Sequence, residues 1–109
     1  MIQLCVRMRA KSPSQPSVIK ALKSITREAQ LERGFIDGRI YQHVDDPDVL
    51  CLEQDWSTAG ELDSHIRSIC FTNLLQIIET AAEAPVLEVH VISAVRGLEY
   101  VDSIRFRGD

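Results

Sequence analysis

Hydrophobic and polar residues alternate along two stretches of the chain, residues 2–9 and residues 49–56. Such alternation is typical of a β-strand that buries one face, because successive side chains of a strand point to opposite sides. Residues 35–44 and 86–95 are predicted as two further strands. The acidic, proline-containing segment 45–48 is predicted as the hairpin turn between the second and third strands.

A spacing of three or four residues between hydrophobic positions predicts a first helix over residues 17–33. The opposite side of this helix carries lysine, arginine and glutamate residues, as expected for a face in contact with water. Gly34 is expected to end the helix, because glycine adopts the left-handed conformation of many helix C-termini without steric cost.

A second helical region follows the third strand. Thr58 with Glu61 three residues later is a capping-box pattern, so a helix is predicted over residues 58–68. A further helical piece is predicted over residues 70–82, and Pro85 is expected to end it.

The predicted elements have the order β-α-β-β-α-β, and residues 98–106 are predicted as an extra C-terminal strand. This order is typical of an α+β, ferredoxin-like fold, in which an antiparallel sheet carries both helical regions on one face. A chain of 109 residues is expected to form a single domain, residues 1–109.

The sheet face without helices is predicted to be partly hydrophobic, and no remaining element is available to cover it. A second sheet from another copy would cover this face, so a homodimer is expected, with the segment from Leu98 reaching the partner. Glu53 and Arg7 are expected to form an ion pair on this face. The hydrophobic side chains expected there are Cys5, Val49, Cys51, Val86 and Ile92.

The composition narrows the classes of partner. The net charge of −4 and an aromatic content of 6% argue against nucleic-acid binding, which requires a basic surface and stacking residues. No apolar run approaches the roughly 20 residues of a membrane span, and the N-terminal residues lack the pattern of a secretory signal. The cysteines, three in number, have no Cys-x-x-Cys spacing. A cytoplasmic protein with reduced thiols is therefore expected.

The corner between the third strand and the second helix carries the candidate chemistry. The strand ends at Trp56, the only tryptophan, and the helix brings His65 into the company of Leu62, Ile66 and Ile69 on one face. We interpret this corner as the mouth of a pocket. The imidazole there is either a structural hydrogen-bonding group or a general base or donor toward a phenolic substrate.

Four hydrophobic residues, Trp56, Phe71, Leu75 and Met8, are interpreted first as core and second as the walls of that pocket. The chain contains no glycine-rich phosphate-binding pattern, and its histidines are scattered over separate elements without metal-ligand spacing. Neither a metal nor a cofactor is therefore expected.

The pattern Glu-x-x-Trp-Ser, then a histidine nine residues after the tryptophan, then Ser-x-x-Phe, resembles the antibiotic-biosynthesis monooxygenase family. The resemblance extends over residues 2–105, and it implies two ferredoxin-like sheets packed as a dimeric α+β barrel. The matching positions are Glu53, Trp56, Ser57, His65, Ser68 and Phe71.

The resemblance implies a cofactor-independent monooxygenase that oxidises a small aromatic quinol or polyphenol with dioxygen. It implies His65 as the base and Trp56, Phe71 and Leu75 as walls of the substrate pocket. Two alternatives remain open: a dimeric small-molecule binding or sensing domain without enzymatic activity, and a structural module whose pocket is filled.

The haem-degrading branch of the same fold is distinguished by an asparagine on the first strand, a tryptophan at the position of His65 and a haem-ligating histidine ten residues later. The first strand of this chain has no asparagine, and Leu75 stands at the ligand position. Because leucine cannot bind iron, haem is not expected.

Overall fold

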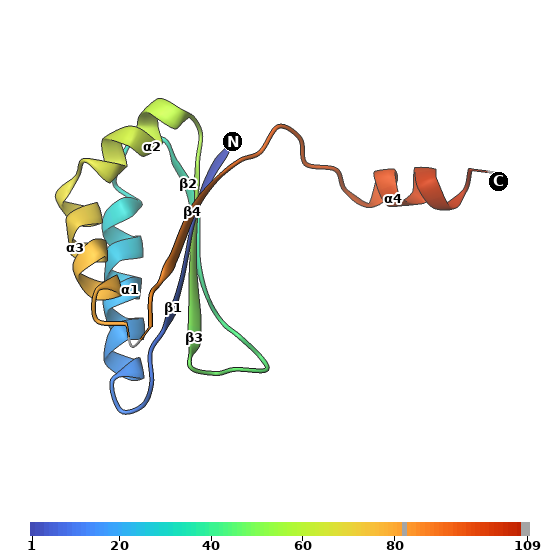
Figure 1. The fold of residues 1–109 in the computed structure, drawn as a ribbon. Coiled ribbons are helices and arrows are strands. Elements are labelled where there is room, and N and C mark those ends of the chain that lie inside the picture. Colours follow the sequence, from blue (N-terminus) through green and yellow to red (C-terminus); the bar gives the residue numbers. More distant parts are fainter. Residues whose placement is uncertain (82, 108–109) are drawn as a thin grey trace.

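The structure, a computed structural model, describes residues 1–81 and 83–107. Its elements are, in chain order, β1 (Ile2–Arg9), α1 (Gln15–Ala29), β2 (Phe35–Gln42), β3 (Val49–Trp56), α2 (Ala59–Ile66), α3 (Ile69–Ile78), β4 (Val86–Val91) and α4 (Leu98–Arg105). The strands form one antiparallel sheet in the order β2-β3-β1-β4. Helices α1, α2 and α3 cover one face of this sheet, and α4 stands apart on the other side (Figure 1). The predicted α+β, ferredoxin-like fold is therefore confirmed.

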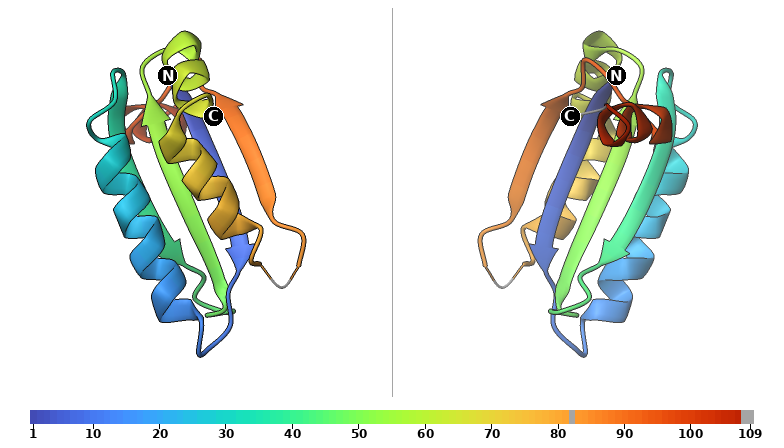
Figure 2. Two further views of the ribbon diagram at one scale, coloured as in Figure 1. Left: turned by 90° about the vertical axis from the view of Figure 1, so that its left-hand side faces the viewer. Right: turned by 90° about the vertical axis from the view of Figure 1, so that its right-hand side faces the viewer.

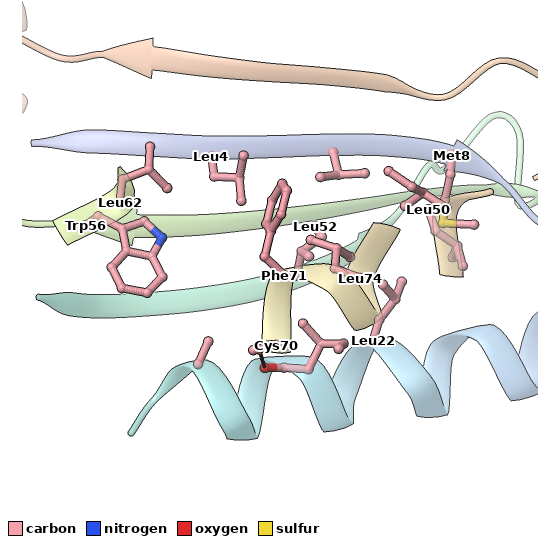
Figure 3. Packing of buried hydrophobic residues seen from close by; sticks show 14 of the residues in the cluster. Leu4, Met8, Leu22, Leu50, Leu52, Trp56, Leu62, Cys70, Phe71 and Leu74 are labelled. Carbon is pink, nitrogen blue, oxygen red and sulfur yellow. Dashed lines mark hydrogen bonds between the residues drawn. The ribbon is translucent and has the colours of Figure 1, made fainter. Parts of the chain in front are cut away.

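The pairing of β1 with β3 places the hydrophobic core. Ile2 lies opposite Trp56 and Met8 lies opposite Leu50, and residues directly opposite one another project to the same side of a sheet. That side faces α1 and α3, whose hydrophobic side chains meet the sheet in one cluster (Figure 3). The largest fully buried hydrophobic members of this cluster are Leu4, Leu22, Leu50, Leu52, Trp56 and Leu74.

Helix α1 ends at Ala29, four residues before the predicted end. The chain leaves the helix through a tighter turn, in which the N–H of Glu32 donates to the carbonyl of Ala29 at 3.0 Å. Gly34 lies in the turn into β2 and has a φ of 87°, a conformation that favours glycine. A Cβ at Gly34 would also collide with the carboxylate of Glu61, so α2 packs directly on this turn.

Side-chain caps define the starts of α2 and α3. The hydroxyl of Thr58 accepts a hydrogen bond from the N–H of Glu61 at 3.2 Å, as the capping-box pattern predicts. Ser68 caps α3 by accepting from the N–H of Phe71 at 3.2 Å, and the predicted second helix therefore stops at Ile66.

The break between α2 and α3 changes which side chains are buried. Leu62 and His65 are buried as predicted, but Ile66 and Ile69 are 38% and 79% exposed. The prediction of one shared face for all four was wrong: Ile66 is the last residue of α2, and Ile69 lies beyond the break at Ser68, which interrupts the helical phase. Helix α3 ends at Ile78, and the predicted helix end at residue 82 lies outside the described residues.

The C-terminal segment corrects the predicted extra strand. Residues 98–106 contain α4 rather than a strand, and β4 ends at Val91 rather than at residue 95. Leu98, Val101 and Ile104 recur every three residues, which suits a helix and not an alternating strand. The carboxylate of Glu99 accepts a hydrogen bond from the N–H of Gly97 at 3.2 Å and so stabilises the helix start. This short helix has no buried residue in the described chain, and it lies at the end of an extended arm (Figure 1). Figure 2 shows α4 on the side of the sheet opposite the other helices.

The helix-free face of the sheet contains a polar network centred on Arg39. Its guanidinium lies 2.9 Å from Asp55, 2.8 Å from Asp37 and 3.4 Å from Glu53. The predicted pair of Glu53 with Arg7 was wrong, because Arg7 lies opposite Cys51 and Arg39 lies opposite Glu53. Hydrogen bonds donated by Arg39 and Gln3 lower the pKa of Asp55. The bond from Arg39 has the largest effect and outweighs burial, which acts to raise this pKa.

Among the described residues no helix combines the length and the hydrophobicity that crossing a membrane requires.

Candidate functional site

His65 lies at the C-terminal end of α2, fully buried between the helices and the sheet. Its ring stacks on the indole of Trp56 with centroids 4.5 Å apart and an interplanar angle of 28°. Phe71 presents its ring edgewise to the imidazole at 5.7 Å. The fold therefore brings three of the predicted site residues together.

A carboxylate completes this arrangement. The Nδ1 atom of His65 lies 2.8 Å from Oε2 of Glu32, which is in the turn after α1. The turn is tied to the strand–helix corner by the N–H of Ser57, which donates to the carbonyl of Gly34 at 2.9 Å. In the neutral imidazole a carboxylate partner selects the tautomer with the proton on Nδ1, and Nε2 then carries the free lone pair.

Three side chains of the site have buried polar atoms without a hydrogen-bond partner among the described residues. These atoms are Nε2 of His65, Nε1 of Trp56, and both amide atoms of Gln54. Gln54 and Trp56 point to the same face of β3, about 7 Å apart along the strand. Buried polar groups are nearly always hydrogen-bonded, so this set is suited to a ligand that carries hydroxyl or carbonyl groups.

The remaining predicted wall residues lie elsewhere. Met8 is at the opposite end of β1 from the Trp56 pairing, about 20 Å along the strand. It lines a separate hollow of about 360 Å³ together with Arg9, His43 and other residues. Leu75 is 37% exposed on α3. The structure therefore places Trp56 and Phe71, but not Met8, against His65.

Neither His65 nor Trp56 lines the larger hollows of the surface. One hollow of about 490 Å³ lies between α1 and α3, and one of about 190 Å³ lies on the helix-free face near Cys5 and His90. The side chain of Glu32 is 25% exposed, so the His65 site approaches solvent at its carboxylate edge.

The sequence analysis missed Glu32 and assigned no role to Gln54. Nothing local marks Glu32, because 33 residues separate it from His65 and only the packing of the turn against α2 joins them. Gln54 does carry a local indication, since it is a polar residue on the hydrophobic face of β3. A polar side chain in that position needs a partner or a function.

A sulfur atom lies on the α3 side of the same histidine. The Sγ of Cys70, a ring nitrogen of His65 and a carboxylate oxygen of Glu32 all lie within 4.8 Å of one another, so these residues could hold a metal ion. Burial raises the pKa of the Cys70 thiol to about 12, and the carboxylates of Glu32 and Glu28 act in the same direction.

No family model and no curated protein matches the chain. Solved structures do match it. A candidate antibiotic biosynthesis monooxygenase from Deinococcus radiodurans has a TM-score of 0.81 and 11% identity, covering 90% of this chain and 98% of the other. A second candidate of that description, from Nitrosomonas europaea, has a TM-score of 0.74 and 17% identity over 86% of this chain and 100% of the other.

A conserved protein from Methanosarcina mazei Go1 is more similar in sequence. It is 26% identical, with a TM-score of 0.74, and the match covers 82% of this chain and 89% of the other. The chain thus has the fold of the antibiotic biosynthesis monooxygenases, and the resemblance predicted from the sequence is confirmed at that level.

Proposed function

We propose that the protein is a cofactor-independent monooxygenase that oxidises a small aromatic quinol or polyphenol with dioxygen. The observation that carries this proposal is the Glu32–His65 pair. It leaves Nε2 of a fully buried imidazole free, beside two aromatic rings. An oriented imidazole with one carboxylate-bound nitrogen and one free nitrogen is the arrangement of a general base.

The proposed reaction begins when Nε2 of His65 removes a phenolic proton. Glu32 stabilises the resulting imidazolium through Nδ1–H. The electron-rich phenolate transfers one electron to dioxygen, and the two radicals combine at a ring carbon to form a hydroperoxide. Loss of water then converts a ring C–H to C=O, so one oxygen atom enters the quinone product and the other leaves as water.

The surrounding residues would bind and orient the ring. Trp56 and Phe71 offer faces and edges for aromatic packing, which is favourable in an offset or edge-to-face arrangement. The Trp56 N–H and the Gln54 amide are donors without partners in the described chain, suited to a developing oxyanion. Because His65 is fully buried, substrate entry requires α2 or α3 to move away from the sheet.

The proposal includes a homodimer. Cys5, Val49, Cys51 and Val86 lie on the helix-free face and are only partly covered within one chain. Arg39 pairs with the carboxylates of Asp37, Glu53 and Asp55 on that face and so offsets part of their charge, which lowers the cost of burying them against a second sheet. Helix α4 exposes hydrophobic side chains at the end of its arm, on the side where the second copy would lie.

Oxygen consumption with dihydroxy-aromatic substrates tests the proposal. We expect uptake by the native protein and a rate lower by about 10²–10⁴ in both His65→Ala and His65→Gln, since each removes one proton transfer. Melting temperatures of all three proteins separate a catalytic loss from unfolding. Equal rates in the three would remove His65 from the reaction. Substrate binding by the native protein without oxygen uptake would favour the binding-domain alternative.

A further inference from the structure

We propose that Glu32, His65 and Cys70 form a binding site for Zn²⁺ or a similar divalent transition-metal ion, at the buried corner where the turn after α1 meets α2 and α3. This inference goes beyond the proposed oxygenase function. It rests on the positions of three donor atoms from three separate segments of the chain, which lie within 4.8 Å of one another.

The donor atoms are close to the geometry of a tetrahedral zinc site. Zinc binds sulfur, nitrogen and oxygen at roughly 2.0–2.3 Å, which places neighbouring ligand atoms roughly 3.3–3.8 Å apart. The Nδ1 of His65 and Oε2 of Glu32 are 2.8 Å apart and would have to separate slightly to bind one ion. Any two donor atoms that are as far apart as the 4.8 Å limit would have to approach each other by about an ångström. Side-chain torsions of Glu32 and Cys70 can supply movements of this size.

The chemistry of the set also fits. Thiolate, imidazole and carboxylate are the three side-chain types that bind zinc in proteins. Glu28, in the last turn of α1, lies outside this set of three, but its carboxylate acts on the Cys70 thiol, so a side-chain movement could bring it in as a fourth ligand.

The electrostatic environment of Cys70 favours a cation. The charged groups that act on its thiol, Glu32 and Glu28, are both acidic. A divalent ion would neutralise these carboxylates and bind the thiolate directly. The thiol gives up only a weak hydrogen bond of 3.5 Å to the carbonyl of Ile25.

The aromatic neighbours orient the histidine ligand. Stacking on Trp56 and the edge-to-face contact with Phe71 hold the ring, so Nδ1 faces Glu32 with little freedom to turn away. A metal on Nδ1 leaves the imidazole proton on Nε2, which then donates rather than accepts. Metal binding and general-base catalysis by His65 therefore exclude each other.

Titration of the full-length, reduced protein with Co²⁺ tests the site, since tetrahedral Co²⁺ bound to a thiolate gives a sulfur-to-metal charge-transfer band in the near ultraviolet. We expect this band at one equivalent, its displacement by Zn²⁺, and a rise in melting temperature with Zn²⁺. Cys70→Ser should abolish the band. Cys51→Ser, on the opposite face of the sheet, is the matched control and should retain it.

Glu32→Gln supplies a second variant at a partly exposed position, and we expect it to weaken Co²⁺ binding at least tenfold. Absence of the band in the native protein would overturn the proposal, as would its persistence in Cys70→Ser or unchanged affinity in Glu32→Gln. These readouts do not depend on oxygenase activity. A protein that binds Co²⁺ but consumes no oxygen would support the metal site and contradict the proposed function. A protein that consumes oxygen but binds no Co²⁺ would support the proposed function and overturn the metal site.

Discussion

Nδ1 of His65 lies 2.8 Å from Oε2 of Glu32, and the imidazole is fully buried while the carboxylate side chain is 25% exposed. The pair therefore has an acidic end near solvent and a free Nε2 directed into the interior. This polarity suits transfer of a proton from a buried ligand to the imidazole.

Replacing Glu32 by Gln should lower the oxygenase rate with little effect on folding. The amide oxygen can still accept from Nδ1–H, but it cannot offset the charge of an imidazolium, and it can also present an N–H that selects the wrong tautomer. We expect a fall in kcat of about 10²–10⁴ in oxygen-uptake assays. Asp63→Asn, at an exposed carboxylate on α2, is the control and should leave the rate unchanged. A Glu32→Gln rate equal to that of the native protein would contradict the role of the pair.

Replacing Gln54 by Leu should stabilise the protein and impair its function. Both amide atoms of Gln54 are buried without a partner in the described chain, and a side chain of similar size without polar atoms avoids that desolvation cost. We expect a gain of about 1–2 kcal/mol in the free energy of unfolding, measured by urea denaturation, together with weaker substrate binding. Gln76→Leu, at an exposed position of α3, should change stability by less than about 0.5 kcal/mol. A destabilised Gln54→Leu protein would mean that the amide is satisfied in the native state.

The Asp55–Arg39 pair predicts a stability that depends on pH. Hydrogen bonding to Arg39 lowers the pKa of Asp55 in the folded protein. A lowered folded pKa stabilises the protein above the usual carboxyl range near 4, and this contribution is lost as the pH falls through the folded value. We expect Asp55→Asn to cost about 1–3 kcal/mol at pH 7 and less at pH 3, measured by urea unfolding at one protein concentration. Asp37→Asn, which removes a more exposed partner of Arg39, should cost less than about 1 kcal/mol. The same cost for Asp55→Asn at both pH values would refute the linkage.

The assembly prediction concerns α4. Val101 and Ile104 are about half exposed at the end of the C-terminal arm, and we expect them to pack on a second copy. The double change Val101→Asp and Ile104→Asp should therefore convert a dimer to a monomer in light scattering at micromolar concentration. Ile69→Asp, at an exposed position on the helical side, should leave the dimer intact. A monomer mass for the native protein would contradict the prediction.

The sheet was predictable from the sequence wherever one face of a strand is buried. The bounds of β3 match the prediction because Leu50, Leu52 and Trp56 alternate with polar residues, and burial of one face imposes that alternation. The start of α2 was predictable for a local reason, since Thr58 caps it with its own side chain. Both features depend on residues close together in the chain.

The C-terminal segment and the acidic half of the site were not predicted. In α4 the alternation of Leu98 and Tyr100 also fits a strand. In the described chain this segment has no neighbouring strand to pair with, and it forms a helix instead. Glu32 pairs with His65 through tertiary packing, which no short pattern encodes. The sequence predicted that His65 and Trp56 lie near each other at the corner between β3 and α2, but not that their rings stack. The ring orientation depends on packing against Phe71 of α3, which is a tertiary contact.

The central claim is that one atom of dioxygen enters the substrate without a cofactor. Reaction of the purified protein with a dihydroxy-aromatic substrate under ¹⁸O₂, followed at once by mass spectrometry, tests this claim directly. The account predicts one ¹⁸O atom per molecule of quinone product, a slower appearance of that product with His65→Gln, and no stoichiometric hydrogen peroxide. A product without ¹⁸O, or oxygen uptake recovered entirely as hydrogen peroxide, would contradict it.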